Sequence, residues 1–433
     1  MKKIVKTTFF ALCVPLLFAA CNAGENEFGR IDQKADVPIP EPVTVASVRN
    51  ISGGAVIKVN IPDDDNIKGI IATYTRGGKE VNTKISRYTD SLLVVGYADT
   101  LAHKVELASF NVNEERSSSV TADFRPLPPA ILLATPQLFQ AFGGVKIRIE
   151  GNTPKADLAV CLLRDEDLND FDKPVGQMKW VEVQTLFTAA DSITLSRRGL
   201  APVEAIYGVY LRDRWGNCSD TAKVTITPLE EVKLPADKFR NANLGDDNLR
   251  VTNRLYPIEA LWDGTGTSEK TGGAYHFFYG EGPRPSWFTI DLGVKAKLSR
   301  VATLPRINYQ IWSIGHPRNF EFWGSLNPTG QEVPGNEHGF DDTWFCLGKF
   351  QQFKPSGYEP DGMVGTVTQD DREYFNNGND FELNNEVFPH AYDELRYLRV
   401  VIVETFASFE NNTPDLAVHL GEVTPWGQII QAY

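Results

Sequence analysis

The sequence predicts an all-β protein built from β-sandwiches. Helical periodicity is scarce along its 433 residues, and short runs of alternating apolar and polar residues recur instead. Glycine, proline, asparagine and aspartate separate these runs, as turn residues separate short antiparallel strands. Hydrophobic residues make up 42% of the chain, enough to build real cores. A chain of this length is expected to contain roughly two to four domains.

The N-terminus carries a candidate secretion signal. Lysines precede an apolar stretch at residues 9–20, which is shorter than the roughly 20 apolar residues of a membrane span. Leu17–Cys21 resembles the lipobox of bacterial lipoproteins, in which the cysteine becomes the lipidated first residue after cleavage. An ordinary signal cleaved after Ala-Ala, with Cys21 incidental, is the alternative. We expect residues 1–21 to form a lipoprotein signal peptide and residues 22–36 a flexible linker.

The linker begins with the polar, mildly acidic stretch Asn22–Glu27. This stretch resembles the export tag of Bacteroidetes surface lipoproteins. The resemblance implies a protein held in the outer membrane by its lipid and facing the cell exterior. No later segment is long and apolar enough to cross a bilayer.

The net charge narrows the range of partners. Loss of the three lysines in the signal takes the charge of the chain from −13 to about −16. Such an acidic chain is a poor partner for nucleic acid and for anionic membrane surfaces. The binding of a neutral sugar is not affected by this negative charge.

Proline-rich joints at 125–129 and 227–235 predict three domains after the linker, at residues 37–126, 127–229 and 230–433. Alternating runs predict strands near residues 55–62, 69–74, 91–97, 104–110 and 119–124, then near 144–150, 157–163, 205–213 and 221–226. The first domain resembles fibronectin type III and related immunoglobulin-like domains, and the second repeats the theme. Neither concentrates polar groups, so we interpret both as spacers. A partner contact by one of them is the alternative.

Three cysteines remain outside the signal and the lipobox, with no metal-like spacing. Cys161 and Cys218 could pair within one domain. Otherwise Cys161, Cys218 and Cys346 are all expected to be small buried apolar residues.

The third domain is dense in aromatic residues and has longer loops. Its motifs, in order, are Ala260–Thr267, Trp287–Gly293, Pro317–Ser325, Arg396–Ile402 and Val418–Val423. This order is similar to that of the discoidin, or coagulation-factor C-type, domain, a galactose-binding-like jelly roll found in many carbohydrate-binding modules. The three-domain architecture also resembles multidomain lipoproteins encoded beside starch-utilisation-like glycan uptake systems.

Alternation within these motifs separates core positions from surface positions. Phe288, Ile290 and Leu292 are expected to share one face of a strand. Residues 399–403 predict a central strand buried on both faces. Three aromatic residues are more simply explained as core than as a binding platform: Phe320, Phe322 and Trp323.

The resemblance implies a structural calcium ion at the Asp-Gly loop of the third domain. By position, its oxygen ligands would be the side chains of Asp263, Thr265, Thr267 and Glu422, with the carbonyl of Leu261. Thr265 departs from the family, where a second aspartate is common, and fewer negative ligands weaken binding. The alternative is a tight Asp-Gly turn closed by local hydrogen bonds.

Sugar recognition needs exposed aromatic faces and a few fixed donors and acceptors. The resemblance places such a site on loops at one end of the sandwich. One loop supplies the candidates Tyr275, His276, Tyr279 and Arg284, and a second supplies Asn308, Tyr309, Trp312 and His316. Trp312 is the leading candidate.

The sequence thus predicts a surface lipoprotein that binds an oligo- or polysaccharide without catalysis, and its resemblances imply outer-membrane glycan transporter components as further partners. A glycosidase needs two carboxylates on a rigid frame, whereas the paired acids here lie in polar loop sequence. No nucleophile elbow, zinc motif or phosphate-binding glycine loop occurs in the sequence. A protein-binding or structural surface subunit remains the main alternative, and a glycoside hydrolase a weaker one.

Overall fold

The computed structural model describes residues 36–433 except 168–169, 268, 308–309 and 412–415. The lipobox with Cys21, the export tag and the predicted linker therefore lie outside the described residues. Contacts between Cα atoms group the chain into two compact units. Among the described residues, the first unit comprises those up to residue 138, then 147–195 and 206–224, and the second comprises 139–146, 196–205 and 225–433. The limits predicted for three domains remain predictions.

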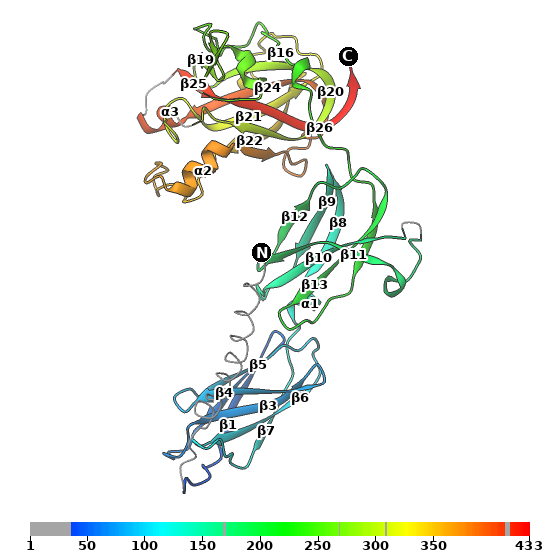
Figure 1. Cartoon of the computed structure of the whole chain (residues 1–433), viewed down its shortest axis with the longest axis vertical. Coiled ribbons are helices and arrows are strands. Elements are labelled where there is room, and N and C mark those ends of the chain that lie inside the picture. Colours follow the sequence, from blue (N-terminus) through cyan, green and yellow to red (C-terminus); the bar gives the residue numbers. More distant parts are fainter. Residues whose placement is uncertain (1–35, 168–169, 268, 308–309, 412–415) are drawn as a thin grey trace, which may run out of the picture. The chain divides into compact units, whose positions relative to one another are not determined.

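The N-terminal part of the first unit contains two antiparallel sheets (Figure 1). The three-stranded sheet has the order β1 (Thr44–Ile51), β2 (Gly54–Asn60) and β5 (Ser91–Val95). The four-stranded sheet has the order β4 (Lys79–Ser86), β3 (Gly69–Arg76), β6 (His103–Phe110) and β7 (Val120–Phe124). One apolar cluster takes residues from both sheets, among them Ile57, Ile70 and Leu107. The predicted sandwich is therefore present here.

Two further sheets follow along the chain. The four-stranded sheet has the order β11 (Trp180–Thr188), β10 (Leu158–Asp165), β13 (Ala205–Asp213) and β14 (Ala222–Ile226). The three-stranded sheet has the order β12 (Ile193–Arg197), β9 (Gly144–Glu150) and β8 (Thr135–Ala141). The three inner strands, β9, β10 and β13, bury nearly all of their apolar side chains.

The C-terminal part is organised around one eight-stranded sheet (Figure 1). Its main path is β15 (Val232–Lys233), β26 (Glu422–Ala432), β20 (Ser286–Leu304), β24 (Glu394–Thr405), β21 (Pro317–Ser325) and β22 (Phe345–Gln351). Two short strands, β16 (Arg240–Asn241) and β23 (Asn379–Glu382), also pair with β20. Two small ribbons complete the strands: β17 (Lys270–Thr271) with β18 (Ala274–Tyr275), and β19 (Phe278–Glu281) with β25 (Ala417–Leu420).

Helices are short among the described residues. The α-helices are α1 (Ala130–Leu133), α2 (Gln369–Asn377) and α3 (Phe406–Asn411). The 3-10 turns are η1 (Val175–Gln177), η2 (Ala236–Lys238), η3 (Ile258–Trp262) and η4 (Glu337–Gly339). Together with the sheets, they confirm the predicted all-β class. No helix in the described ranges is long and apolar enough to span a membrane.

β20 connects the different parts of the C-terminal sheet. Its first half pairs with β24 and its second half with β26 and β23, with register shifts between the halves. At the bend, Gly293 has a φ of +64°, and a Cβ there would lie 2.7 Å from the carbonyl oxygen of Lys238. A glycine is therefore required where the strand bends.

The core positions predicted for this sheet are confirmed. Phe288, Ile290 and Leu292 of β20 are buried in one large apolar cluster, as expected from their alternation. Residues 398–402 of β24 are buried without a break, which identifies a strand covered on both faces. The three aromatic residues assigned to the core, Phe320, Phe322 and Trp323, are also buried.

The cysteine predictions need correction. Cys161, Cys218 and Cys346 are all free thiols, so Cys161 and Cys218 do not pair. Only Cys161 is buried, whereas Cys346 is half-buried and Cys218 is exposed because it lies in the turn between β13 and β14. Burial raises the pKa of the Cys346 thiol to about 11, which keeps it protonated and unreactive at neutral pH.

Candidate functional site

Alternating aromatic residues around β18 and β19 build one face of the candidate site. The ring centroids of Tyr275 and Phe277 lie 5.4 Å apart, and the ring of Tyr256 contacts those of Tyr275, Phe277 and Tyr279, so these rings share one face. Phe277 is fully buried beneath the two tyrosines, which are half-buried. The intervening residues point the other way: Phe278 enters the core and His276 turns to the Asp-Gly loop. The alternation thus separates an aromatic face from a polar one.

Tyr256 completes the aromatic face from a turn earlier in the chain. The Tyr275 amide donates to the Leu255 carbonyl at 2.8 Å, which ties the β17–β18 hairpin to this turn. The rings of Tyr256 and Tyr275 are stacked, with centroids 5.0 Å apart and planes inclined by 10°. The rings of Tyr256 and Tyr279 lie 5.6 Å apart. We call Tyr256, Tyr275 and Tyr279 the tyrosine cluster.

Charged and polar groups surround the tyrosine cluster. The Tyr279 hydroxyl donates to Glu281 Oε1 at 2.5 Å. The Arg306 guanidinium lies 3.9 Å from the ring centroid of Phe277, a cation–π contact. The His419 ring, opposite Tyr279 in the β19–β25 ribbon, lies 5.0 Å from the Tyr279 ring. Burial and the charge of Arg306 lower the pKa of His419 to about 4, so this ring is neutral at neutral pH.

A second group of polar residues lies at the Asp-Gly loop after η3. Asp263 Oδ1 accepts from the Thr265 amide at 3.0 Å and from the Thr265 hydroxyl at 2.6 Å. Glu422, at the start of β26, is 7% exposed, and its Oε1 has no hydrogen-bond partner among the described residues. A Cβ at Gly266 would lie 2.5 Å from Leu304 Cδ2 and 3.4 Å from Glu422 Cγ, so the loop passes close to both side chains.

The two carboxyl groups at this loop titrate differently. Burial, together with the charge of Asp263, raises the pKa of Glu422 to about 7 against the opposing effect of the Thr265 and Gly264 amides. Burial also acts to raise the pKa of Asp263, but hydrogen bonds from Thr265 and His276 outweigh it, and the net shift is downward. A buried carboxyl oxygen without a partner, beside an ionised aspartate, favours a cation.

The donor set at this loop fits the calcium site that the sequence predicts. Asp263, Thr265 and Glu422 come together, and Leu261 is buried in η3 just before the loop. Thr267 is half-buried, and its hydroxyl accepts from the Glu269 amide at 3.4 Å. All the donor atoms are oxygens, the type calcium prefers.

His276 belongs to this loop and not to the tyrosine cluster. Its Nδ1 lies 2.5 Å from Asp263 Oδ2, and its Nε2 lies 2.8 Å from the Thr271 hydroxyl. The side chain of His276 therefore lies with the Asp-Gly loop and not with Tyr275, and its expected sugar contact stays a prediction. His276 connects the Asp-Gly loop to the hairpin that carries Tyr275.

The leading candidate, Trp312, is not a binding platform. It is 1% exposed, and its indole Nε1 donates to the Asp371 carbonyl at 3.2 Å. Phe375 of α2 and Phe406 of α3 pack on its ring at centroid distances of 5.1 and 5.6 Å. The long segment between β22 and β23 thus covers the ring, and the prediction of an exposed Trp312 is wrong.

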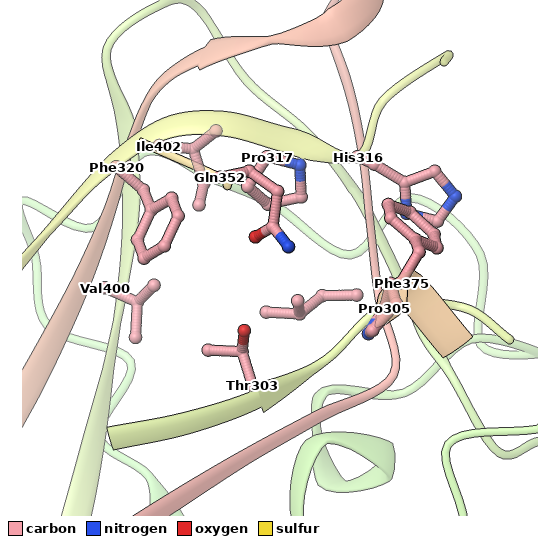
Figure 2. Close-up of a pocket in the computed structure, with 10 residues that line it drawn as sticks. Thr303, Pro305, His316, Pro317, Phe320, Gln352, Phe375, Val400 and Ile402 are labelled. Atoms are coloured by element: carbon pink, nitrogen blue, oxygen red, sulfur yellow. The ribbon is translucent and has the colours of Figure 1, made fainter. Parts of the chain in front are cut away.

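His316 is likewise buried, at 1% exposure, and its ring packs against Phe375. The two residues lie together at one side of a small internal cavity, with Phe320, Val400 and Ile402 on the other side (Figure 2). The cavity measures about 20 Å³, room for roughly one water molecule. It is too small for a sugar ring, so His316 is also a wrong prediction as a sugar contact.

Arg284 donates hydrogen bonds to backbone carbonyls on both sides of the β20–β25 boundary. Its Nη1 donates to the Gly282 carbonyl at 2.8 Å, and its Nη2 donates to the Ala417 carbonyl at 2.6 Å. These bonds fasten the start of β20 to β25, and the expected sugar contact of Arg284 stays a prediction. Asn308 and Tyr309 lie outside the described residues.

The structure therefore keeps two of the eight sugar candidates together, Tyr275 and Tyr279, and adds residues that the sequence reading missed. Three of the additions are Tyr256, Arg306 and His419. Only the aromatic alternation through Phe277 gave a local signal for this face. Tyr256 and His419 come from distant segments, and their approach depends on strand pairing that no short motif records.

The fold defines a multidomain β-sandwich protein. Three family models match the chain, and each describes a domain of unknown function. DUF4959 matches residues 40–126, DUF5126 matches residues 127–237, and DUF5000 matches residues 262–427. No curated protein matches this chain.

Several solved structures are similar to parts of this chain at low sequence identity. A SusE-like protein is 24% identical, with 70% of this chain and 100% of that chain covered and a TM-score of 0.41. The C-terminal domain of a chitobiase from Bacteroides fragilis is 13% identical, covering 46% and 100%, with a TM-score of 0.29. A CBM32 module from Clostridium perfringens, in complex with GalNAc-β-1,3-galactose, is 10% identical, covering 45% and 99%, with a TM-score of 0.26.

Proposed function

We propose that this protein is a cell-surface lipoprotein that binds carbohydrate without catalysis, as an accessory to a glycan uptake system. The observation that carries the binding role is the tyrosine cluster, in which three half-buried rings lie together at one end of the C-terminal sandwich. Tyrosine rings cover the apolar C–H faces of a sugar, and their hydroxyls bond to its hydroxyl groups.

The neighbouring polar groups suit a neutral sugar. Glu281 offers a carboxylate acceptor, held by the Tyr279 hydroxyl. Arg306 offers guanidinium donors beside the aromatic face. Because His419 is neutral at neutral pH, the site carries one cation and one anion and has no strong net charge.

Affinity electrophoresis against a panel of polysaccharides tests the binding role. GalNAc-β-1,3-galactose, the ligand of the similar CBM32 module, is the first oligosaccharide for calorimetry. We expect retardation by at least one glycan, and its loss in the double variant Tyr256→Ala, Tyr279→Ala. Tyr88→Ala is the matched control, because Tyr88 is 91% exposed in the first unit. No retardation with any glycan would remove the binding role, and release of reducing sugar would overturn the non-catalytic one.

We also propose that Asp263 and Glu422, with Thr265, Thr267 and the Leu261 carbonyl, hold a calcium ion. The bound ion would supply a fixed positive charge to two carboxylates at one loop. Calcium is then expected to raise the melting temperature of metal-free protein and to release heat on titration. Glu422→Gln is expected to abolish both effects while leaving the protein folded. An absence of heat and of any thermal shift in the parent protein would rule the ion out.

The membrane anchor is part of the same proposal and rests on the sequence alone. Cys21→Ser is expected to prevent incorporation of labelled palmitate in cells and to release the protein from the membrane fraction. Protease added to intact cells is expected to digest the anchored protein, because the proposed location faces the exterior. Protection of the protein in intact cells would place it on the inner side of the outer membrane.

A further inference from the structure

The connector between β14 and β15 is held by backbone hydrogen bonds within the second unit. The Leu229 amide donates to the Ala141 carbonyl at 3.0 Å, and the Gly143 amide donates to the Leu229 carbonyl at 2.7 Å. Ala141 ends β8 and Gly143 lies at the turn before β9, so the connector pairs with the β8–β9 hairpin. β15 follows at once and pairs with β26 of the C-terminal sheet. Only Glu230 and Glu231 lie between the two pairings.

The Glu231 carboxylate lies at the centre of a charged network. Its side chain is 7% exposed. Its Oε1 lies 3.2 Å from Arg198 Nη1 and 3.4 Å from Arg300 Nε, and it accepts from the Ser299 hydroxyl at 2.5 Å. Arg198 lies in the loop between β12 and β13, whereas Ser299 and Arg300 lie in β20. One buried carboxylate thus connects this loop to the C-terminal sheet.

Both arginines also contact a second carboxylate. Arg198 pairs with Glu382 and Arg300 pairs with Asp380, and both of these acids lie in β23. The Arg300 guanidinium also lies 4.3 Å from the ring centroid of Trp426 in β26. A guanidinium offers several donors in a fixed plane, so one arginine can hold two acceptors at once. Moving the loop away from the sheet would break both contacts of Arg198.

The β8–β9 hairpin makes further contacts beside the connector. Phe142, at the turn of the hairpin, is 3% exposed, and its ring lies 5.0 Å from the Tyr392 ring in an edge-to-face arrangement. Lys146 Nζ lies 2.6 Å from Glu386 Oε1. Tyr392 and Glu386 belong to the segment between β23 and β24. An aromatic contact and an ion pair thus hold the hairpin against this segment.

Gly143 brings the hairpin directly against Glu231. Its φ is +63°, a left-handed conformation that favours glycine. A Cβ at this position would lie 2.9 Å from Glu231 Oε2. A side chain here would therefore displace the carboxylate that contacts the two arginines.

The first unit contains the same backbone arrangement with a proline in place of the glutamate. The Leu127 amide donates to the Ile51 carbonyl at 2.9 Å, and the Gly53 amide donates to the Leu127 carbonyl at 2.9 Å. Gly53 has a φ of +64°, and a Cβ there would lie 3.4 Å from Pro129 Cβ. Because Pro129 carries no charge, this joint is an internal comparison for the one that contains Glu231.

We propose that the connector is a rigid clamp, in which Glu231 holds the β8–β9 hairpin and the loop between β12 and β13 on the C-terminal sheet. Because Glu231 and Arg300 are largely buried, water and salt screen their attraction only weakly. The proline-rich stretch at 227–235 is then a fixed part of the second unit and not a hinge. The clamp needs no ligand, so it is independent of the proposed carbohydrate-binding function.

Hydrogen–deuterium exchange of the whole protein, resolved to single amides by fragmentation in the mass spectrometer, gives a direct test. The amides of Leu229 and Gly143, called here the connector amides, would exchange in a flexible connector as fast as in an unstructured peptide. In a rigid clamp we expect both to exchange at least about tenfold more slowly than in such a peptide. A smaller difference overturns the clamp.

A variant then tests the role of Glu231. Glu231→Gln keeps the shape of the side chain and removes its charge. The connector amides are expected to exchange about tenfold faster than in the parent, the effect of weakening a hydrogen bond to a charged group. The amides of Leu127 and Gly53 in the first unit should keep their rates, because Pro129 occupies the position that corresponds to Glu231. Glu106→Gln is the matched control, because Glu106 is exposed in β6.

Arg198→Gln tests the same network from a more accessible position, since the Arg198 side chain is 29% exposed. It is expected to accelerate exchange of the connector amides as Glu231→Gln does, while circular dichroism shows a folded protein. Unchanged rates of the connector amides in both variants would mean that Glu231 does not hold the clamp, and the inference fails. Equal acceleration of the first-unit amides would indicate a global loss of stability and would also overturn a local clamp.

Discussion

At the residue scale, Trp312 is an aromatic residue that the sequence analysis assigned to sugar binding and that the structure places in an apolar cluster. A tryptophan in a loop rich in polar and aromatic residues has the composition of a sugar platform. Its φ of +53° is uncommon for a residue other than glycine and is held by the surrounding packing. The ring is enclosed by an apolar cluster that includes Val364, Phe375 and Phe406. Its contribution is to stability and not to recognition.

Replacing Trp312 by alanine is therefore expected to lower the free energy of unfolding by about 3–5 kcal/mol, because it leaves a cavity in that cluster. Urea denaturation measures the change. Phe187→Ala is the control, since Phe187 is 77% exposed and its loss should cost little. Trp312→Phe is expected to remain folded and to bind glycan like the parent protein. Lost glycan affinity in folded Trp312→Phe would restore Trp312 as a contact.

His419 predicts a pH dependence of stability. Its pKa is about 4 in the folded chain, below its ordinary value of 6.5, because burial and Arg306 disfavour the charged ring. The unfolded chain then binds the extra proton first, so the stability from this residue is complete above pH 6.5 and is lost as the pH falls toward 4. The loss amounts to roughly 3 kcal/mol at most.

Comparison with His419→Gln isolates this contribution from the carboxylates that titrate in the same range. The difference in unfolding free energy between the two proteins is expected to change between pH 7 and pH 4, with the parent losing more. Urea denaturation at several pH values provides the measurement. A constant difference across that range would mean that His419 titrates normally in the folded chain.

At the element scale, the segment between β22 and β23 is ordered by a buried ion pair. Lys354 and Asp371 have almost no exposed surface, and Lys354 Nζ lies 3.3 Å from Asp371 Oδ2. Asp371 also caps α2 by accepting from the Thr368 amide at 2.8 Å, and it accepts from the amide and hydroxyl of Ser356. These bonds hold its pKa far below the ordinary range, although burial alone would raise it.

Lys354→Met is expected to destabilise the protein by about 3–5 kcal/mol, because it leaves the Asp371 carboxylate buried without its cation. Limited proteolysis is expected to cut the segment 353–378 more readily in this variant. Lys349→Met is the control, because the Lys349 side chain is 42% exposed. Adding Asp371→Asn to Lys354→Met should recover part of the loss. If Lys354→Met resists protease like the parent, the pair does not order this segment.

Some strands and ribbons could be predicted from the sequence, and others could not. The strands were predictable, because alternation and turn residues act over a few neighbours. The burial of Phe288, Ile290 and Leu292 followed from that alternation. The ribbon that pairs Tyr279 with His419 could not be predicted, because it joins residues far apart in the chain.

At the scale of the whole molecule, net charge predicts how binding responds to salt. The proposed ligand is neutral, so the negative field of the chain neither attracts nor repels it. Glycan affinity measured by calorimetry is therefore expected to change less than about twofold between low and high salt. Dextran sulfate is expected not to bind, with uncharged dextran as its control. A steep salt dependence would indicate an anionic ligand at a basic site such as Arg306.

The sequence by itself determined the all-β class, the approximate positions of many strands and several core positions of the C-terminal sheet, because these depend on local patterning. The resemblance of its motifs to a known family also identified the carboxyl groups of Asp263 and Glu422 as candidate calcium ligands. Only the tertiary structure decided which aromatic rings are exposed. Trp312 is covered by residues from α2 and α3, whereas Tyr275 meets Tyr256 at the surface. Exposure depends on which distant segment packs on a side chain, and no local pattern encodes that packing.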